Sequence, residues 1–253
     1  LEGIPGNVEA NPMLGMHGIR FSLKNPEILK AELNAMKRVS EKEKEKKICI
    51  MAPQIISVDE VKSLKKIIKD LGFQKAKIGV MIETPASVQV IKEICEEGID
   101  FASFGTNDLT QYTLAVDRGN EQVQKLYDEM HPSILRQLAH VITVCRQNNV
   151  ESSICGQAGS KKEMVKFLVS QGIDSISVNA DAAADIAEYI AELEKEVAVR
   201  ESEEEYEEKT GEDSAEKDSS KKDASPVYNE QDNELPVIPG AEYDKAAEET
   251  EEE

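Results

Sequence analysis

Polar side chains that could take part in catalysis follow three short apolar runs of this sequence. Glu83 follows the first run, Gly105-Thr106-Asn107-Asp108 follows the second, and Cys155 ends the third. The carboxyl ends of strands face the active site in parallel α/β proteins, so we expect these groups to lie together. A carboxylate and an Asn-Asp pair from neighbouring strands offer the hard oxygen ligands that Mg²⁺ prefers. The alternative for Glu83 and Asp108 is that each carboxylate only interacts with a helix dipole.

The thiol of Cys155 is a second kind of candidate. Cys155 lies between an apolar run and a glycine, outside any helical stripe. A thiol at the end of a strand can donate or accept a proton when its surroundings tune its pKa. The alternative is a buried structural cysteine, which is the commoner case in proteins. The four cysteines are far apart in the sequence and form no Cys-x-x-Cys pair, which favours reduced thiols over disulfides.

The elements that would position these residues alternate along residues 1–200. Six apolar runs rich in Ile, Val and Phe are too short for helices and are typical of buried parallel strands. Between them, apolar residues recur at helical spacing, as at Ile134, Leu138 and Val141. This alternation predicts a parallel sheet with connecting helices. The six runs are Gly18–Leu23, Lys47–Ala52, Lys77–Ile82, Asp100–Phe104, Val150–Cys155 and Asp174–Val178.

Local signals mark where the helices should begin and end. Two pairs, Ser57–Glu60 and Ser160–Glu163, fit the capping box, in which a hydroxyl and a carboxylate bind the first free amides of a helix. Thr84-Pro85 fits an N-cap followed by proline in the first turn. The glycines that should end helices in the left-handed conformation are Gly72, Gly98 and Gly172.

The number of units bears on the architecture within the α/β class. We count six β-α units, whereas a closed (β/α)8 barrel contains eight, usually in about 250 residues. We therefore predict a TIM-type (β/α)8 barrel whose first two β-α units lie before Leu1. The alternative is an open doubly wound sheet. No Gly-x-Gly-x-x-Gly follows any of the predicted strands, which disfavours the dinucleotide-binding form of that sheet.

The distribution of charge divides the chain into two parts. Its 253 residues carry a formal net charge of −20, and residues 201–253 alone hold 21 acidic and 5 basic residues. This stretch has too few apolar residues to offset the entropy of ordering. We therefore predict a partial barrel domain over residues 1–200 and a disordered acidic tail over residues 201–253. The acidity disfavours nucleic acid and anionic membranes as partners, since both attract basic surfaces.

Features of the sequence also bear on its location. No apolar run approaches the roughly 18 residues of a membrane span, and no basic-then-apolar signal peptide opens the chain. Together with the reduced cysteines, this predicts a cytoplasmic protein. The chain begins without Met in a loop-like segment, so we expect it to be a piece of a longer protein.

Four motifs occur in order along the chain: Asn11–Gly15, Lys77–Pro85, Phe104–Arg118 and Ile154–Gln157. Over about residues 9–195, the chain strongly resembles the C-terminal phosphoenolpyruvate (PEP)-binding barrel of the PEP-utilising enzymes. That family comprises phosphoenolpyruvate synthase, pyruvate phosphate dikinase and enzyme I of the sugar phosphotransferase system. The block Phe104–Arg118 is very specific for the family. Cys-Gly-Gln, in place of the Cys-Gly-Glu of the dikinase and enzyme I, is most similar to the synthase.

The resemblance implies a role for each candidate residue. Glu83 and Asp108 would bind Mg²⁺, and Cys155 would move the proton at C3 of the pyruvate enolate. Arg118 would add a bidentate phosphate contact, its alternative being a surface ion pair with a neighbouring acid. The residues implied to bind substrate are His17, Arg20, Gly105, Thr106, Asn107, Asp108 and Arg118.

One position departs from the family pattern. The family usually has Asn-Pro-x-Leu-Gly-x-Arg-x-x-Arg, in which the first arginine contacts phosphate. In this chain His17 stands at that position, and Arg20 keeps the second arginine. A histidine is only partly charged at neutral pH and cannot make a two-pronged phosphate contact. We therefore expect weak PEP binding.

The resemblance favours one function and leaves two others open. It implies the PEP- and pyruvate-binding domain of a pyruvate, water dikinase, which makes PEP from pyruvate through a phosphohistidine. It also implies a homodimer and partner domains that this chain lacks, namely the phosphohistidine carrier and the ATP-binding domain. The alternatives are a non-catalytic PEP- or pyruvate-sensing module, which His17 favours, and a lyase of the pyruvate/PEP class. The intact Cys155 and Phe104–Arg118 block argue against both.

Overall fold

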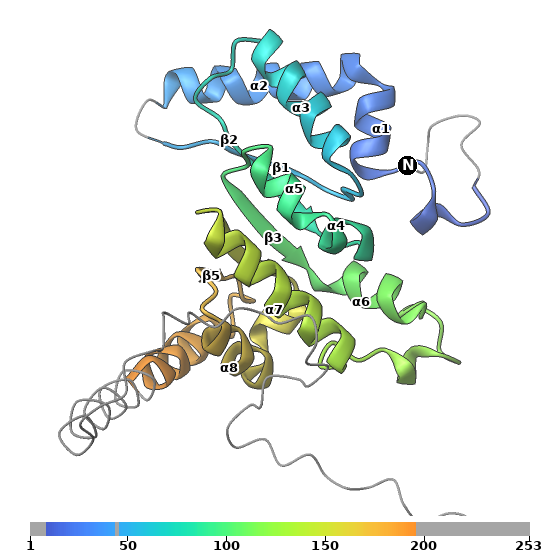
Figure 1. The fold of residues 1–253 in the computed structure, drawn as a ribbon, viewed down its shortest axis with the longest axis vertical. Helices are drawn as coiled ribbons and strands as arrows, with labels where there is room; N and C mark the ends of the chain where they lie inside the picture. The colour runs from blue at the N-terminus through green and yellow to red at the C-terminus, as the bar shows by residue number, and fades with distance from the viewer. Residues whose placement is uncertain (1–8, 44–45, 196–253) are drawn as a thin grey trace, which may run out of the picture. The chain divides into compact units, whose positions relative to one another are not determined.

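A parallel β-sheet carries most of the residues predicted for the site (Figure 1). Residues 9–43 and 46–195 are described by the computed structural model. Five strands of this part lie side by side in chain order, each parallel to its neighbours. The strands are β1 (Cys49–Ala52), β2 (Lys77–Ile82), β3 (Phe101–Gly105), β4 (Glu151–Cys155) and β5 (Ser175–Ile176).

Helices connect the strands and cover the sheet. The α-helices are α1 (Gly18–Lys24), α2 (Pro26–Lys42), α3 (Val58–Asp70), α4 (Pro85–Gln89), α5 (Ile91–Glu96), α6 (Thr106–Leu114), α7 (Pro132–Gln147) and α8 (Lys162–Gln171), and residues 183–195 are also helical. Short 3-10 helices are η1 (Pro12–Leu14), η2 (Gln124–Leu126) and η3 (Gln157–Ser160). Parallel crossovers are right-handed, so strands in chain order place their connecting helices on one face. In Figure 1, α4, α5 and α7 lie in front of β3, and α5 packs against α7.

The core lies between the sheet and this helix layer. Ile82, Phe104 and Ile154 are paired in register across β2, β3 and β4, and none is more than 1% exposed. Helix α7 packs against β3 and β4, and its buried residues include Ile134 and Leu138, as their spacing predicts. Each fully buried side chain of this size contributes roughly 1.5–3 kcal/mol. The ends of β2, β3 and β4, which carry the site residues, are therefore held in place by a row of well-packed apolar side chains.

The segment Gly18–Leu23 is helical, so the predicted strand at this position is wrong. Its apolar residues alternate as in a strand, but a strand also needs a neighbour for its backbone hydrogen bonds. Here α1 packs against α2 and α3, and the Ile19 N–H donates to the Pro53 carbonyl at 3.1 Å. The described residues therefore contain five strands in place of the predicted six.

One predicted capping box is confirmed and the other is wrong. The Ser57 N–H donates to Glu60 Oε2 at 3.1 Å at the start of α3. Helix α8 begins only at Lys162, because Ser160 belongs to η3 and its Oγ accepts a hydrogen bond from the Asn179 N–H. The Ser160 hydroxyl therefore binds a residue far along the chain, and it does not cap α8 as the sequence pattern predicted.

The other predicted helix ends are confirmed. Thr84 caps α4, since its Oγ1 accepts a hydrogen bond from the Ser87 N–H at 3.1 Å. The glycines that follow α3, α5 and α8 adopt positive φ angles of 64°, 86° and 74°, which glycine reaches at little cost. These residues are Gly72, Gly98 and Gly172.

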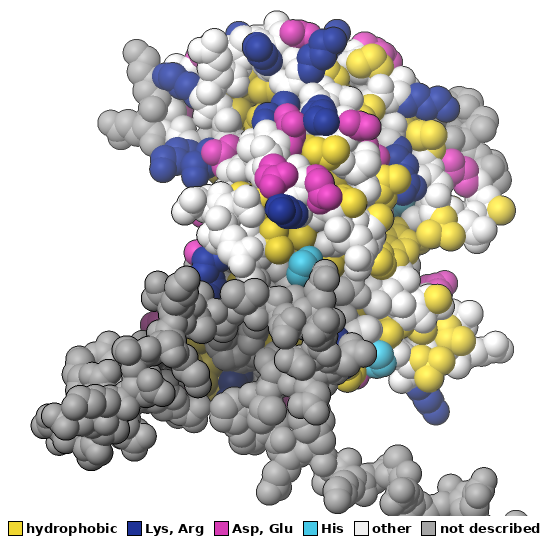
Figure 2. Space-filling view, viewed as in Figure 1, with side chains coloured by type: hydrophobic (Ala, Val, Ile, Leu, Met, Phe, Trp, Pro, Cys, Tyr) yellow, Lys and Arg dark blue, Asp and Glu magenta, His cyan; other side chains and the backbone are white. Residues whose placement is uncertain are grey.

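Where the described residues are visible in Figure 2, basic and acidic side chains are interspersed. Within the described ranges, no helix combines the length and the apolar character needed to cross a membrane. The predicted domain boundary at residue 200 and the predicted acidic tail, residues 201–253, lie outside the described residues.

Candidate functional site

The carboxyl ends of β2, β3 and β4 bring together the central residues of the predicted site. Glu83 directly follows β2, and Gly105 ends β3 at the start of α6. Cys155 ends β4 and is paired in register with Gly105. Helix α6 begins on this same edge of the sheet, so its first residues also belong to the site. The residues gathered here are Glu83, Gly105, Thr106, Asn107, Asp108 and Cys155.

Gln54, which no sequence pattern marks, links the two carboxylates. Its backbone N–H donates to Glu83 Oε1 at 2.6 Å, and its side-chain Nε2 donates to Asp108 Oδ2 at 3.1 Å. Gln54 is 4% exposed and Glu83 is 5% exposed. Residues that follow three adjacent strand ends therefore converge on one buried polar cluster.

The environment of Glu83 disfavours its negative charge. Burial raises the pKa of Glu83 from 4.5 to about 7; the backbone N–H of Gln54 lowers it, and the charge of Asp108 raises it again. The carboxylate also lies close to Gly105, where an added Cβ would be 2.7 Å from Glu83 Oε2. Glycine at this position therefore makes room for the carboxylate.

This pair of acids fits a hard divalent cation. Mg²⁺ is usually held by one or two carboxylates and keeps several water ligands. Glu83 and Asp108 supply that number of carboxylates, and a cation held by them would offset the burial and repulsion that raise the pKa of Glu83. Residues 9–43 and 46–195 contain no group of three or more His, Cys, Asp or Glu that could hold a metal.

The raised pKa of Glu83 predicts a pH dependence of stability in metal-free buffer. Between pH 4.5 and about 7 the folded chain binds more protons at Glu83 than the unfolded chain, so its stability falls as the pH rises. Across this pH range the unfolding free energy should fall by about 3 kcal/mol because of Glu83. Glu83→Gln keeps a carbonyl acceptor for Gln54 but carries no charge. We expect urea unfolding with EDTA to show this variant as more stable than wild type at pH 8 and nearly equal at pH 4.5.

An exposed acid provides the control for this measurement. Glu163→Gln, in the first turn of α8, removes a charge at the surface. It should leave the difference in unfolding free energy between pH 4.5 and pH 8 as in wild type. Equal pH profiles for wild type and Glu83→Gln would contradict the prediction.

The thiol of Cys155 lies beside the first turn of α6. Cys155 is half-buried, and its Sγ donates to the Phe104 carbonyl at 3.4 Å. Gly156 follows with φ +111°, and an added Cβ there would be 3.3 Å from Thr106 Oγ1 and 3.8 Å from the Asn107 amide. Thr106 Oγ1 is buried and has no hydrogen-bond partner among the described residues. The turn after β4 thus brings a thiol, an amide and an unpaired hydroxyl together.

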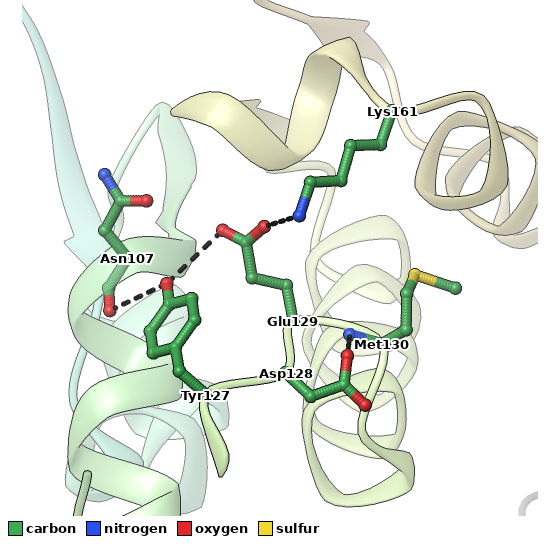
Figure 3. A network of polar contacts seen from close by, with 6 residues as sticks. All are labelled: Asn107, Tyr127, Asp128, Glu129, Met130 and Lys161. Carbon is green, nitrogen blue, oxygen red and sulfur yellow. Dashed lines mark hydrogen bonds and ion pairs between the residues drawn. The ribbon is translucent and has the colours of Figure 1, made fainter. Parts of the chain in front are cut away.

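A second polar network contacts the backbone of Asn107 (Figure 3). The Tyr127 hydroxyl donates to the Asn107 carbonyl at 3.3 Å and lies 3.4 Å from Glu129 Oε1. Lys161 pairs with Glu129 Oε2 at 2.6 Å, and the Glu129 side chain is only 3% exposed. Burial, and then the charge of Glu129, raise the pKa of Tyr127 to about 12. The loop before α7 carries Tyr127 and Glu129 without any motif that would have marked them.

Arg118 lies near this network. It lies in the exposed loop after α6, where its backbone N–H donates to Gln111 Oε1 at 3.2 Å. Its positive charge is one of the smaller influences that lower the pKa of Tyr127. The side chain is therefore within electrostatic reach of the residue that contacts Asn107.

Arg20 and His17 lie around the start of α1, not on a strand. Arg20 Nη1 donates to the Gly15 carbonyl at 3.3 Å, and His17 Nε2 is hydrogen-bonded to the Met13 carbonyl at 2.8 Å. Tyr112 Oη donates to the same Met13 carbonyl at 2.6 Å. Burial raises the pKa of Tyr112, as do the charges of Asp108 and Glu83, whereas Arg20 lowers it. Tyr112 thus lies between the segment before α1 and the two acids.

Comparison with known proteins shows which family and which proteins this chain is similar to. Residues 1–195 match the family model of the PEP-utilising enzyme, PEP-binding domain. The chain is 50% identical over 192 residues to the phosphoenolpyruvate synthase of Pyrococcus furiosus. It is 48% identical over 193 residues to the probable phosphoenolpyruvate synthase of Methanocaldococcus jannaschii. These alignments cover 75% of this chain, but 23% and 16% of those two proteins.

A relative with a different name matches a similar share of the chain. The phosphoenolpyruvate-protein phosphotransferase of Buchnera aphidicola subsp. Acyrthosiphon pisum is 40% identical over 192 residues, which is 72% of this chain and 33% of that protein. The chain therefore spans only a sixth to a third of the length of these three relatives. With the family model matched over residues 1–195, the chain belongs to the PEP-utilising enzymes and contains their PEP-binding domain.

Proposed function

We propose that this chain is the PEP- and pyruvate-binding part of a phosphoenolpyruvate synthase. The observation that carries the proposal is the cluster of Glu83, Asp108 and Cys155 at adjacent strand ends, in a chain 50% identical to a relative of that name. The whole enzyme would convert ATP, pyruvate and water into AMP, PEP and phosphate. The phosphohistidine carrier and the ATP-binding site would lie outside the PEP-binding domain, and we expect a cytoplasmic homodimer.

Each residue of the cluster has a chemical task in this proposal. Glu83 and Asp108 hold Mg²⁺, which when bound offsets the negative charge that develops on the substrate oxygens. Asn107, the Thr106 hydroxyl and the backbone at Gly105 bind the substrate carboxylate and phosphate. Their support is the unpaired, buried Thr106 Oγ1 beside the Asn107 amide, which leaves a donor for a ligand.

The remaining residues act on carbon and on the phosphoryl group. Cys155 carries the proton to or from C3 of the enolate. In support of this role, its half-buried thiol lies at the end of β4, and β4 pairs with β3, the strand that leads into Asn107 and Asp108. Arg118 and Arg20 supply positive charge for the phosphoryl group. Substrate is expected to draw Arg118 inward, since it lies on an exposed loop.

We also propose that the sheet is a sector of a (β/α)8 barrel. Five parallel strands follow one another in chain order without a reversal, as in a barrel. A doubly wound sheet would change direction at a switch point. The described chain contains five of the eight strands that a closed barrel requires.

A non-catalytic PEP or pyruvate sensor is the second candidate. The observation in its favour is His17, which stands where the family has an arginine and is hydrogen-bonded to the Met13 carbonyl. A sensor would keep magnesium-dependent binding and lose proton transfer at Cys155. Measurements of binding and of proton exchange therefore separate the two candidates.

The binding part of the proposal is tested on the 253-residue chain by calorimetric titration with PEP and with pyruvate. We expect both to bind with Mg²⁺ present and neither to bind in EDTA. Asp108→Asn should weaken binding by on the order of 10- to 100-fold, because a carboxylate ligand is lost. Asp117→Asn, in the exposed loop after α6, should bind as wild type. Binding that is absent with Mg²⁺, or unaffected by Asp108→Asn, would overturn the proposal.

A further inference from the structure

Gln54 touches both carboxylates of the proposed cation site. It lies two residues beyond β1 and is 4% exposed. Its N–H is 2.6 Å from Glu83 Oε1, and its Nε2 is 3.1 Å from Asp108 Oδ2. The residue therefore directs both its backbone and its side-chain amide toward the site.

The backbone of Gln54 is held in a conformation that side chains rarely adopt. Its φ is +59°, in the left-handed region that is costly for residues with a Cβ. The contact with Glu83 helps to hold it, and so does Gly18 at the start of α1, where an added Cβ would lie 2.7 Å from Gln54 Cβ. The Ile19 N–H also binds the preceding carbonyl, that of Pro53, at 3.1 Å. These contacts restrain the backbone and the first side-chain carbons of Gln54, and the carboxamide is the part of the side chain farthest from them.

We propose that Gln54 is a third protein ligand of the divalent cation at Glu83 and Asp108, an inference that rests on the proposed function. In the structure, the NH₂ group of Gln54 donates to Asp108 Oδ2. A cation at the acids repels the amide hydrogens and attracts the amide oxygen, so the carboxamide turns and presents Oε1. The terminal torsion of glutamine is broad and two-fold, which makes this turn easy. Amide oxygens are ordinary ligands of hard cations.

The competing explanation is that Gln54 remains a donor and only positions Asp108. Two substitutions distinguish the roles without touching the backbone bond to Glu83. Gln54→Met keeps the length of the side chain but removes both the oxygen and the amide hydrogens. Gln54→Glu keeps an oxygen and, when ionised, has no hydrogen to donate to Asp108.

The experiment measures Mn²⁺ binding to the 253-residue chain by electron paramagnetic resonance, with water proton relaxation to count the waters on bound Mn²⁺. We expect Gln54→Met to bind Mn²⁺ on the order of 10-fold more weakly and to add one water to the bound ion. Gln54→Glu should bind at least as tightly as wild type. Gln171→Met, at the end of α8 and away from the acids, should match wild type.

Three other outcomes would contradict the inference that Gln54 is a ligand. Gln54→Glu binding as weakly as Gln54→Met would assign Gln54 the positioning role only. Gln54→Met binding as tightly as wild type, or more tightly, would exclude it as a ligand. Wild type that binds no Mn²⁺ would overturn the proposed cation site itself. If circular dichroism shows Gln54→Met to be unfolded, the comparison of Gln54→Glu with wild type decides.

Discussion

Replacing Cys155 by Ala should slow the exchange of pyruvate methyl protons with solvent by on the order of 100-fold or more. The thiol is half-buried at the end of β4, and the adjoining Gly156 lies against Thr106 and Asn107. Under the proposed function it is the acid–base group at C3, and alanine cannot hold a proton there. The measurement uses the 253-residue chain with Mg²⁺, inorganic phosphate and pyruvate in D₂O, and follows the methyl signal by nuclear magnetic resonance.

Two comparisons give this result its meaning. Cys49→Ala changes an exposed thiol at the first residue of β1, so it should leave the exchange rate unchanged. Calorimetry should show that Cys155→Ala still binds pyruvate with Mg²⁺, because proton transfer at C3 and substrate binding use different residues. Exchange at the wild-type rate in Cys155→Ala would exclude the thiol as the acid–base group. Absence of exchange in wild type, with binding intact, would favour the sensor.

Replacing His17 by Arg should tighten PEP binding by roughly 10- to 150-fold. The resemblance to the PEP-utilising enzymes implies an arginine at this position of the Asn-Pro-x-Leu-Gly block, where this chain has His17. Arginine adds a permanent charge and a two-pronged contact with phosphate, together worth about 1.5–3 kcal/mol. In the structure the histidine ring is hydrogen-bonded to the Met13 carbonyl at 2.8 Å. An arginine side chain at this position is longer and has more donors, so it could extend to the phosphate and not bind the Met13 carbonyl.

A charge placed nearby separates this specific contact from general attraction. Leu14→Arg adds the same charge to the same segment on a side chain that is 67% exposed, and it should change the dissociation constant of PEP far less. Pyruvate has no phosphate, so its affinity should be similar in wild type and His17→Arg. Unchanged PEP affinity in His17→Arg would mean that His17 does not stand at the phosphate position.

Much of the fold could be read from residues close together in the chain. Strand β2 occupies the predicted Lys77–Ile82, and α7 buries the predicted stripe that includes Ile134 and Leu138. These predictions succeed because side-chain periodicity and capping act over a few residues. The expected position of Asn107 and Asp108 at one edge of the sheet is confirmed for the same reason, since β3 leads directly into α6.

Local patterns were insufficient where a partner lies far along the chain. The short apolar run Gly18–Leu23 suggested a strand, but packing against α2 and α3 makes this segment a helix. The capping pattern at Ser160 likewise gave way to a contact with Asn179. In both cases a tertiary contact outweighed a local preference.

The properties of the site depend most strongly on the folded arrangement. Gln54 lies 29 residues before Glu83 and 54 before Asp108, and only the pairing of β1, β2 and β3 brings the three together. The pKa of Glu83 likewise follows from burial and from the charge of Asp108. The identities of the candidate acids and thiol follow from sequence motifs, which record residue type and spacing. The hydrogen-bond partners and protonation states of these residues are decided only when the strands pair, because burial and electrostatic energy depend on distances through space.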